Sequence, residues 1–164
     1  MTKRRGLGVL ILIFILAIAF PAFAEKGKPP VPPEIGGLKL AHYLKGEEAL
    51  REIERLHGKK INVKEGYVAH YEGRESKAML YISRASSGPQ AKGQIKRMAE
   101  RIRKGGTPFY HLKEFALADG IDLYSAIGLG QVHYFYRTGN KVVWLAADPP
   151  VARSALSSLL KAVR

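Results

Sequence analysis

Short turns between strand-like segments are the feature that most constrains how this chain can fold. Apolar and polar residues alternate with a period of two in six segments, which is typical of β-strands. The clearest pair turns at Thr138-Gly139-Asn140. Strands joined by turns this short pair in the antiparallel direction, because a parallel connection needs a dozen or more residues. The predicted strand pairs are 61–71 with 77–84, 109–118 with 121–126, and 131–137 with 141–147.

Three other segments repeat their apolar residues at the spacing of an α-helix. The first spans 46–57, the second spans 89–104, and the third begins at Asp148, with Pro149 in the favoured first position. We therefore predict the α+β class, with a single antiparallel, curved β-sheet and about three helices packed mainly on one face. The nearly continuous apolar run 142–145 predicts a central strand that is covered on both faces.

The first 24 residues have the three parts of a secretory signal peptide. Basic residues at 3–5 precede an apolar run at 7–20, and Ala22 and Ala24 are small enough for the pocket of a signal peptidase. We expect cleavage near Ala24 and a periplasmic or secreted location for the mature protein. A retained membrane anchor is the alternative, although the run is at the short end of the roughly 20 residues that a spanning helix needs.

A proline- and glycine-rich linker is predicted at 25–37, directly after the cleavage site. Four of the five residues at 29–33 are prolines, which cannot donate backbone hydrogen bonds and favour an extended spacer. The rest of the chain, 38–164, is long enough to bury a core without covalent cross-links. We predict that it forms one α+β domain.

Composition limits both the chemistry and the partners of this domain. The chain has no cysteine, which excludes disulfides, a thiol nucleophile and cysteine zinc sites. Its formal charge of +13 falls to +10 without residues 1–24, since these contain three basic residues and no acid. A surplus of this size favours anionic partners. Outside the cytoplasm we expect an anionic lipid, a glycan or an acidic envelope protein and no nucleic acid, while solubility alone is the other interpretation.

The predicted helix 89–104 has the most localised functional pattern. Its basic side chains surround a narrow apolar stripe, and Glu100 is the one acidic residue. Such a face can bind anionic lipid or glycan in a peripheral membrane contact. It can also be a solvated helix face, on which long basic side chains cover apolar surface. The anion-binding candidates are Lys92, Lys96, Arg97, Arg101, Arg103 and Lys104.

Aromatic residues are frequent in the predicted strands, and tyrosine is the commonest of them. Aromatic rings on a sheet can line a groove for a sugar or a lipid chain, and each tyrosine hydroxyl offers a hydrogen bond. Strand propensity alone also explains tyrosines at these positions. The ligand-groove candidates are Tyr67, Tyr71, Tyr134, Tyr136 and Trp144.

Histidines give a third possible site. His70, His111 and His133 lie in different predicted strands and would act as ligands for a metal ion or haem if they met on one sheet face. No two histidines have the i, i+4 spacing of a helical metal site, and no serine lies in a Gly-x-Ser-x-Gly elbow. We predict no metal, no cofactor and no catalytic residue, with these three histidines as the alternative.

Together these patterns predict an exported, non-catalytic binding protein of the cell envelope. It would engage an anionic lipid head group, glycan or acidic protein through the basic helix. Two alternatives stay open: an accessory subunit of an envelope protein complex, and a histidine metal- or haem-binding protein or enzyme. The same fold is compatible with all three classes.

Overall fold

The computed structural model describes residues 30–57, 63–117 and 120–163. The predicted signal peptide at 1–24 lies outside the described residues, as do residues 25–29 of the predicted linker. The described strands are β1 (Glu34–Ile35), β2 (Leu38–Lys45), β3 (Glu65–Glu72), β4 (Lys77–Arg84), β5 (Phe109–Ala116), β6 (Asp122–Gly128), β7 (Gln131–Thr138) and β8 (Lys141–Ala147). The described helices are α1 (Gly46–His57), α2 (Gly88–Arg103) and α3 (Ala152–Ala162).

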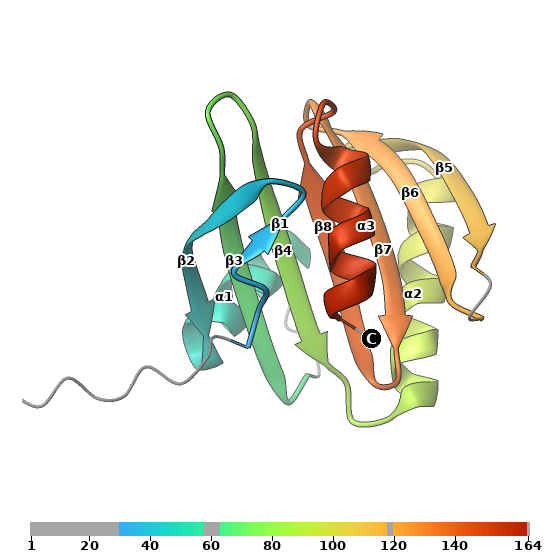
Figure 1. The fold of residues 1–164 in the computed structure, drawn as a ribbon. Coiled ribbons are helices and arrows are strands. Elements are labelled where there is room, and N and C mark those ends of the chain that lie inside the picture. Colours follow the sequence, from blue (N-terminus) through green and yellow to red (C-terminus); the bar gives the residue numbers. More distant parts are fainter. Residues whose placement is uncertain (1–29, 58–62, 118–119, 164) are drawn as a thin grey trace, which may run out of the picture.

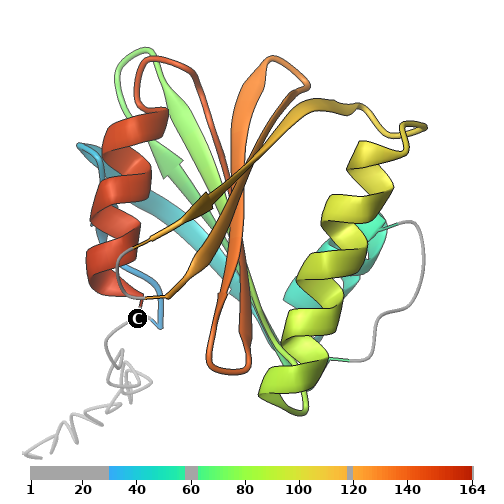
Figure 2. The ribbon, with the colours of Figure 1, turned by 90° about the vertical axis from the view of Figure 1, so that its right-hand side faces the viewer.

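The strands form one eight-stranded sheet in the order β1-β2-β3-β4-β8-β7-β6-β5, and every neighbouring pair is antiparallel. The sheet curls strongly from one edge to the other (Figures 1 and 2). Strand β8 lies inside the sheet, and all its residues after Lys141 are buried. The predicted α+β class and the predicted two-sided burial of this strand are both confirmed.

Helices cover both faces of the sheet, because alternate side chains of the inner strands are apolar on both sides. Leu80 of β4 and Leu145 of β8 belong to the core beneath α3. Trp144 belongs to the core beneath α2, and a smaller cluster under α1 contains Val68. Figure 2 shows α3 on one side of the sheet and both α1 and α2 on the other. Two of the three described helices therefore share a face.

Strands β1 and β2 were not predicted from the sequence. The pairing of β2 with β3 shifts register between Leu40 and His42, so the period of two is interrupted within the strand. Upstream of β2, Val31 and Ile35 are buried in the α3 core, although they belong to the segment 25–37 that was predicted as a linker. The Gly36 N–H donates to Ser158 Oγ at 3.0 Å, which fastens this segment to α3.

The starts of α1 and α2 agree with the prediction to within one residue, but the start of α3 does not. Helix α2 begins after Ser87, whose hydroxyl accepts from the Gln90 N–H at 3.3 Å, as expected of an N-cap. The prediction that Asp148 caps the last helix is wrong, because α3 begins four residues later. The Asp148 carboxylate instead accepts from the Lys77 N–H and from the Gln131 side-chain amide, both at 2.9 Å. Asp148 therefore links the starts of β4 and β7 by hydrogen bonds and does not cap a helix.

Candidate functional site

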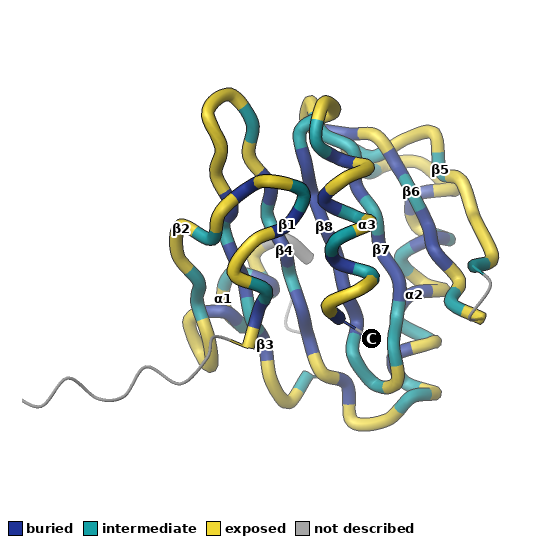
Figure 3. The backbone as a smooth tube through the Cα atoms, in the orientation of Figure 1, coloured by how far each residue is buried: buried dark blue, intermediate teal, exposed yellow. Residues whose placement is uncertain are grey.

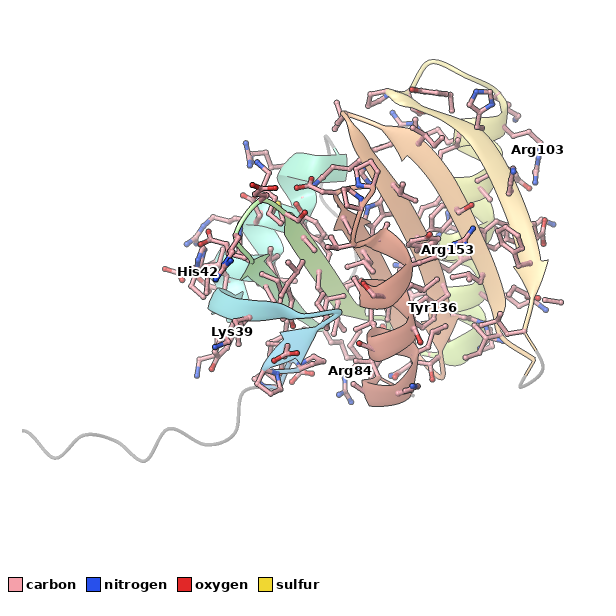
Figure 4. All side chains as sticks on the ribbon, turned by 45° about the horizontal axis from the view of Figure 1, so that its top comes forward. Lys39, His42, Arg84, Arg103, Tyr136 and Arg153 are labelled. Atoms are coloured by element: carbon pink, nitrogen blue, oxygen red, sulfur yellow. The ribbon has the colours of Figure 1, made fainter. Side chains whose placement is uncertain are left out.

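Helix α2 packs on the part of the sheet formed by β5, β7 and β8. Its buried stripe of Ala91, Ile95, Ala99 and Ile102 meets the aromatic side chains of the sheet beneath it. This stripe occupies the narrow apolar face that the sequence predicts. All six predicted anion-binding residues of the helix are exposed, and Arg103 can be followed beside β5 in Figure 4.

A cavity of about 220 Å³ lies between α2 and the strands β5, β6 and β7; we call it the α2 cleft. Its volume corresponds to roughly seven water molecules, which suits a head group or a single sugar substituent. Ile95, Ala99 and Tyr124 supply apolar surface. Its charged lining residues are Lys92, Lys96, Arg103 and Arg137, together with Glu100, Glu114 and Asp122.

Near the C-terminus of α2, the cleft contains an ion pair and a hydrogen bond that share one carboxylate. The guanidinium of Arg103 lies 3.8 Å from the Glu114 carboxylate, and the Tyr124 hydroxyl donates to Glu114 at 2.8 Å. Burial, with the Glu114 hydrogen bond as the second cause, raises the pKa of Tyr124 to about 12. Glu114 is therefore held by two neighbours, and Tyr124 stays a neutral donor at physiological pH.

The opposite end of the cleft, which we call its basic end, contains three cations and one carboxylate, Asp122, whose register in β6 places it beside Arg137 of β7. Gly88, at the start of α2, faces the carbonyl of Gly139 in the turn after β7, which brings the first turns of the helix close to Arg137. Lys92 and Lys96 line the cleft from the helix, and Arg137 lines it from the sheet. Within the described ranges, none of these three cations forms an ion pair.

The six predicted cations fall into two groups. Lys92, Lys96 and Arg103 line the α2 cleft, whereas Arg97, Arg101 and Lys104 are exposed outside it. The division follows helix geometry, since residues three, four and seven apart share a face.

Four of the five predicted groove residues lie on one face of the sheet, but they do not form an open groove. Tyr71 and Tyr136 are completely buried in the α3 core, and Tyr67 and Tyr134 pack against it. Trp144 lies on the opposite face, under α2. Tyr67 also lines a smaller cavity of about 140 Å³ near the end of α3; its other lining residues include Arg84, Lys141 and Val163.

His133 is buried, and both of its ring nitrogens are engaged within the fold. Its Nδ1 accepts from the Trp144 indole N–H at 3.1 Å, and its Nε2 is 2.9 Å from the carbonyl oxygen of Gly128. This arrangement defines a neutral ring with the proton on Nε2. Burial lowers the pKa of His133, which keeps the ring neutral.

The other two predicted histidines lie elsewhere. His70 stacks on His42 of β2, with ring centroids 4.2 Å apart, and its pKa is lowered by burial and then by His42. His111 is exposed at a bulge in β5. The fold therefore does not bring His70, His111 and His133 together. In the described part of the chain, no three histidine or acidic side chains are grouped so that they could hold a metal ion.

Sequence reasoning missed the residues that the sheet contributes to the α2 cleft. The alternation of β7 places Arg137 on the same face as His133 and Phe135, but it does not reveal which helix covers that face. Glu114 and Tyr124 come from the neighbouring strands β5 and β6. Glu114 and Tyr124 are cross-strand partners in a hairpin that the sequence predicts, but the packing of α2 over this hairpin and over β7 has no local sequence signal.

Comparisons with protein-family models, with curated proteins and with solved structures found no match to this chain. Among the described helices, none combines the length and the apolar character needed to cross a membrane.

Proposed function

We propose that this protein is an exported, non-catalytic binding protein of the cell envelope, and that it engages an anionic component through α2. The observation that carries the proposal is the basic end of the α2 cleft. There Lys92 and Lys96 meet Arg137 from the sheet, and none of them has an ion-pair partner within the described ranges.

Charge and geometry both support an anion at this end. The three cations outnumber Asp122, the carboxylate beside Arg137, and the remaining positive charge attracts an anionic ligand. Arg137 also offers a planar guanidinium, which suits phosphate and carboxylate oxygens. At the other end, Glu114 is already engaged by Arg103 and Tyr124. The basic end is thus the part of the cleft best suited to a phosphate, sulfate or carboxylate group.

A charge-reversal series tests the proposal. The test variant combines Lys92→Glu, Lys96→Glu and Arg137→Glu. The matched control combines Lys39→Glu, Lys45→Glu and Lys161→Glu, which changes the net charge equally at exposed positions on β2 and α3. Both are compared with the unaltered domain for binding to phosphatidylglycerol vesicles, heparin and polyglutamate, and circular dichroism checks that each variant folds.

We expect the test variant to lose at least about tenfold in affinity for one of these probes, since each basic residue near an anionic surface contributes about 1 kcal/mol. The control variant should lose much less affinity than the test variant. Equal losses in both variants would mean that net charge, rather than the α2 cleft, attracts anions. Absence of binding to all three probes at low salt would overturn the proposed function. Binding to polyglutamate alone would favour an accessory subunit with an acidic protein partner.

A further inference from the structure

The large apolar side chains that are exposed in the described structure lie on β5, on β6 or in the turn after β6. Three of them gather at one end of these strands, and we call them the apolar tip: Tyr110, Ile127 and Leu129. Their exposed fractions are 55%, 40% and 70%. Tyr110 and Ile127 are cross-strand partners, and Leu129 follows two residues later in the β6–β7 turn. The turn is at the top of Figure 1, and β5 is mostly exposed in Figure 3.

Leu129 occupies an unfavourable position for a leucine. Its φ is +53° and that of Gly130 is +77°, so the two residues form a tight turn in which both have left-handed backbone. Turns of this type favour Asn-Gly, because asparagine tolerates positive φ and leucine does not. The side chain is also largely exposed to solvent. Neither the backbone conformation nor the exposure of the side chain favours leucine at this position. Residues with such backbone strain are common at functional sites.

A basic segment lies at the same end of the molecule. Residues 101–113 comprise the end of α2, its connection to β5 and the first half of β5. They contain four lysine or arginine residues and His111, with no acid between Glu100 and Glu114. The segment approaches the tip directly: a Cβ on Gly128 would lie 2.6 Å from the carbonyl oxygen of Pro108. Figures 1 and 2 show the end of α2, the start of β5 and the β6–β7 turn at one end of the fold.

We propose that this end of the molecule docks on a bilayer that contains anionic lipids. The apolar tip enters the interfacial region, and residues 101–113 contact the head groups. The inference goes beyond the proposed function, because this surface lies at the opposite end of α2 from Lys92, Lys96 and Arg137, and it names an anionic membrane as the partner. Tyrosine and aliphatic side chains beside a cluster of cations are the combination that holds interfacial proteins on such surfaces.

A protein strand added to the edge of the sheet is less compatible with this region. The edge strand β5 is interrupted by a bulge between Tyr110 and Lys113, and Lys113 and Glu114 place charges in its middle. Bulges and charged residues are features that protect edge strands from pairing. A projecting turn with an exposed leucine suits insertion between lipid head groups better than pairing along the edge.

The substitution Leu129→Asn tests the proposal, because stability and docking should change in opposite directions. Asparagine relieves the backbone strain and leaves the charge unchanged, so the domain should unfold at a higher temperature. Partitioning onto phosphatidylglycerol vesicles should weaken about tenfold, since the inserted leucine is lost. Phe115→Ser is the matched control, because Phe115 is 44% exposed on the same edge strand but lies near its other end. This control should leave vesicle binding unchanged.

A second variant reports on insertion directly. Leu129→Trp places an indole at the tip, while the one native tryptophan, Trp144, is buried and provides a constant background. The tip indole should shift to shorter emission wavelength with phosphatidylglycerol vesicles and be quenched by brominated acyl chains. With phosphatidylcholine vesicles the shift should be much smaller, because the basic segment then lacks its anionic partners.

The outcomes separate this inference from the proposed function. If Leu129→Asn and the unaltered domain bind anionic vesicles equally, the apolar tip does not insert and the inference is wrong, while anion binding through α2 stands. Binding to heparin or polyglutamate but not to vesicles would also show that the inference is wrong, while anion binding through α2 stands. If the Leu129→Asn and Phe115→Ser variants weaken vesicle binding equally, general apolar exposure explains the binding and the inference again fails. Absence of binding to every anionic probe overturns both proposals.

Discussion

The hydroxyl of Tyr136 leads to an unusual prediction, namely that removing a polar group should stabilise the domain. Tyr136, which is labelled in Figure 4, is completely buried in the α3 core. Within the described residues its hydroxyl has no hydrogen-bond partner. Burial raises its pKa, so the ring is neutral under all ordinary conditions. A buried polar atom without a partner costs about 1–3 kcal/mol. The variant Tyr136→Phe removes that cost and keeps the shape of the ring.

Tyr71 provides a matched control in the same core. It is equally buried, but its hydroxyl donates to the carbonyl oxygen of Pro32 at 2.9 Å. The variant Tyr71→Phe breaks that bond and should lower the free energy of unfolding by about 1 kcal/mol. Urea unfolding followed by circular dichroism should therefore separate the two variants by about 2–4 kcal/mol, in opposite directions from the unaltered domain. A destabilised Tyr136→Phe variant would refute the reasoning, because it would show that this hydroxyl makes a favourable bond.

Two further predictions concern stability. Burial lowers the pKa of His133 and of His70 in the folded state. As the pH falls toward about 6.5, the unfolded state therefore binds more protons than the folded state. The free energy of unfolding should consequently fall between pH 7.5 and pH 5.5. The variant His133→Gln, which keeps one acceptor and one donor, should flatten that fall in urea titrations, and an unchanged pH dependence would contradict the assignment. Gly36 has a φ of +57°, and a Cβ there would lie 2.4 Å from the backbone nitrogen of Ala155, so Gly36→Ala should cost at least about 2 kcal/mol. Gly37→Ala, at a φ of +84° but in open space, should cost only about 1 kcal/mol, and equal losses in thermal unfolding would show that the contact with α3 is unimportant.

The regular parts of this fold could be predicted from the sequence because their periodicity is local. The bounds of α1, α2, β4 and β8 agree with the predicted ranges to within one residue. The prediction failed where the periodicity is interrupted or where a residue has a distant partner. The register shift in β2 hides that strand, and Asp148, which looks like a helix cap, binds groups on two other strands.

The candidate site could be predicted only in part, for the same reason. Lys92 and Lys96 follow from the pattern of one helix, whereas Arg137 reaches the α2 cleft through the sheet order. The apolar tip could not be predicted, because a leucine in a strand-like region is normally expected to be buried. Leu129 is exposed because it lies in a tight turn at the end of the molecule, where no other described element covers its side chain.

The location of the binding surface can be measured directly by nuclear magnetic resonance of the isotope-labelled domain, titrated with small bicelles that contain phosphatidylglycerol. We predict that backbone signals change in α2, in residues 101–113 and in the β6–β7 turn around Leu129, and that α1, β2 and β3 stay unchanged. The changes should weaken as salt is added, because the attraction depends on exposed cations. Signal changes confined to β2 and α1, or no change at low salt, would contradict the proposal that the basic helix binds an anionic surface.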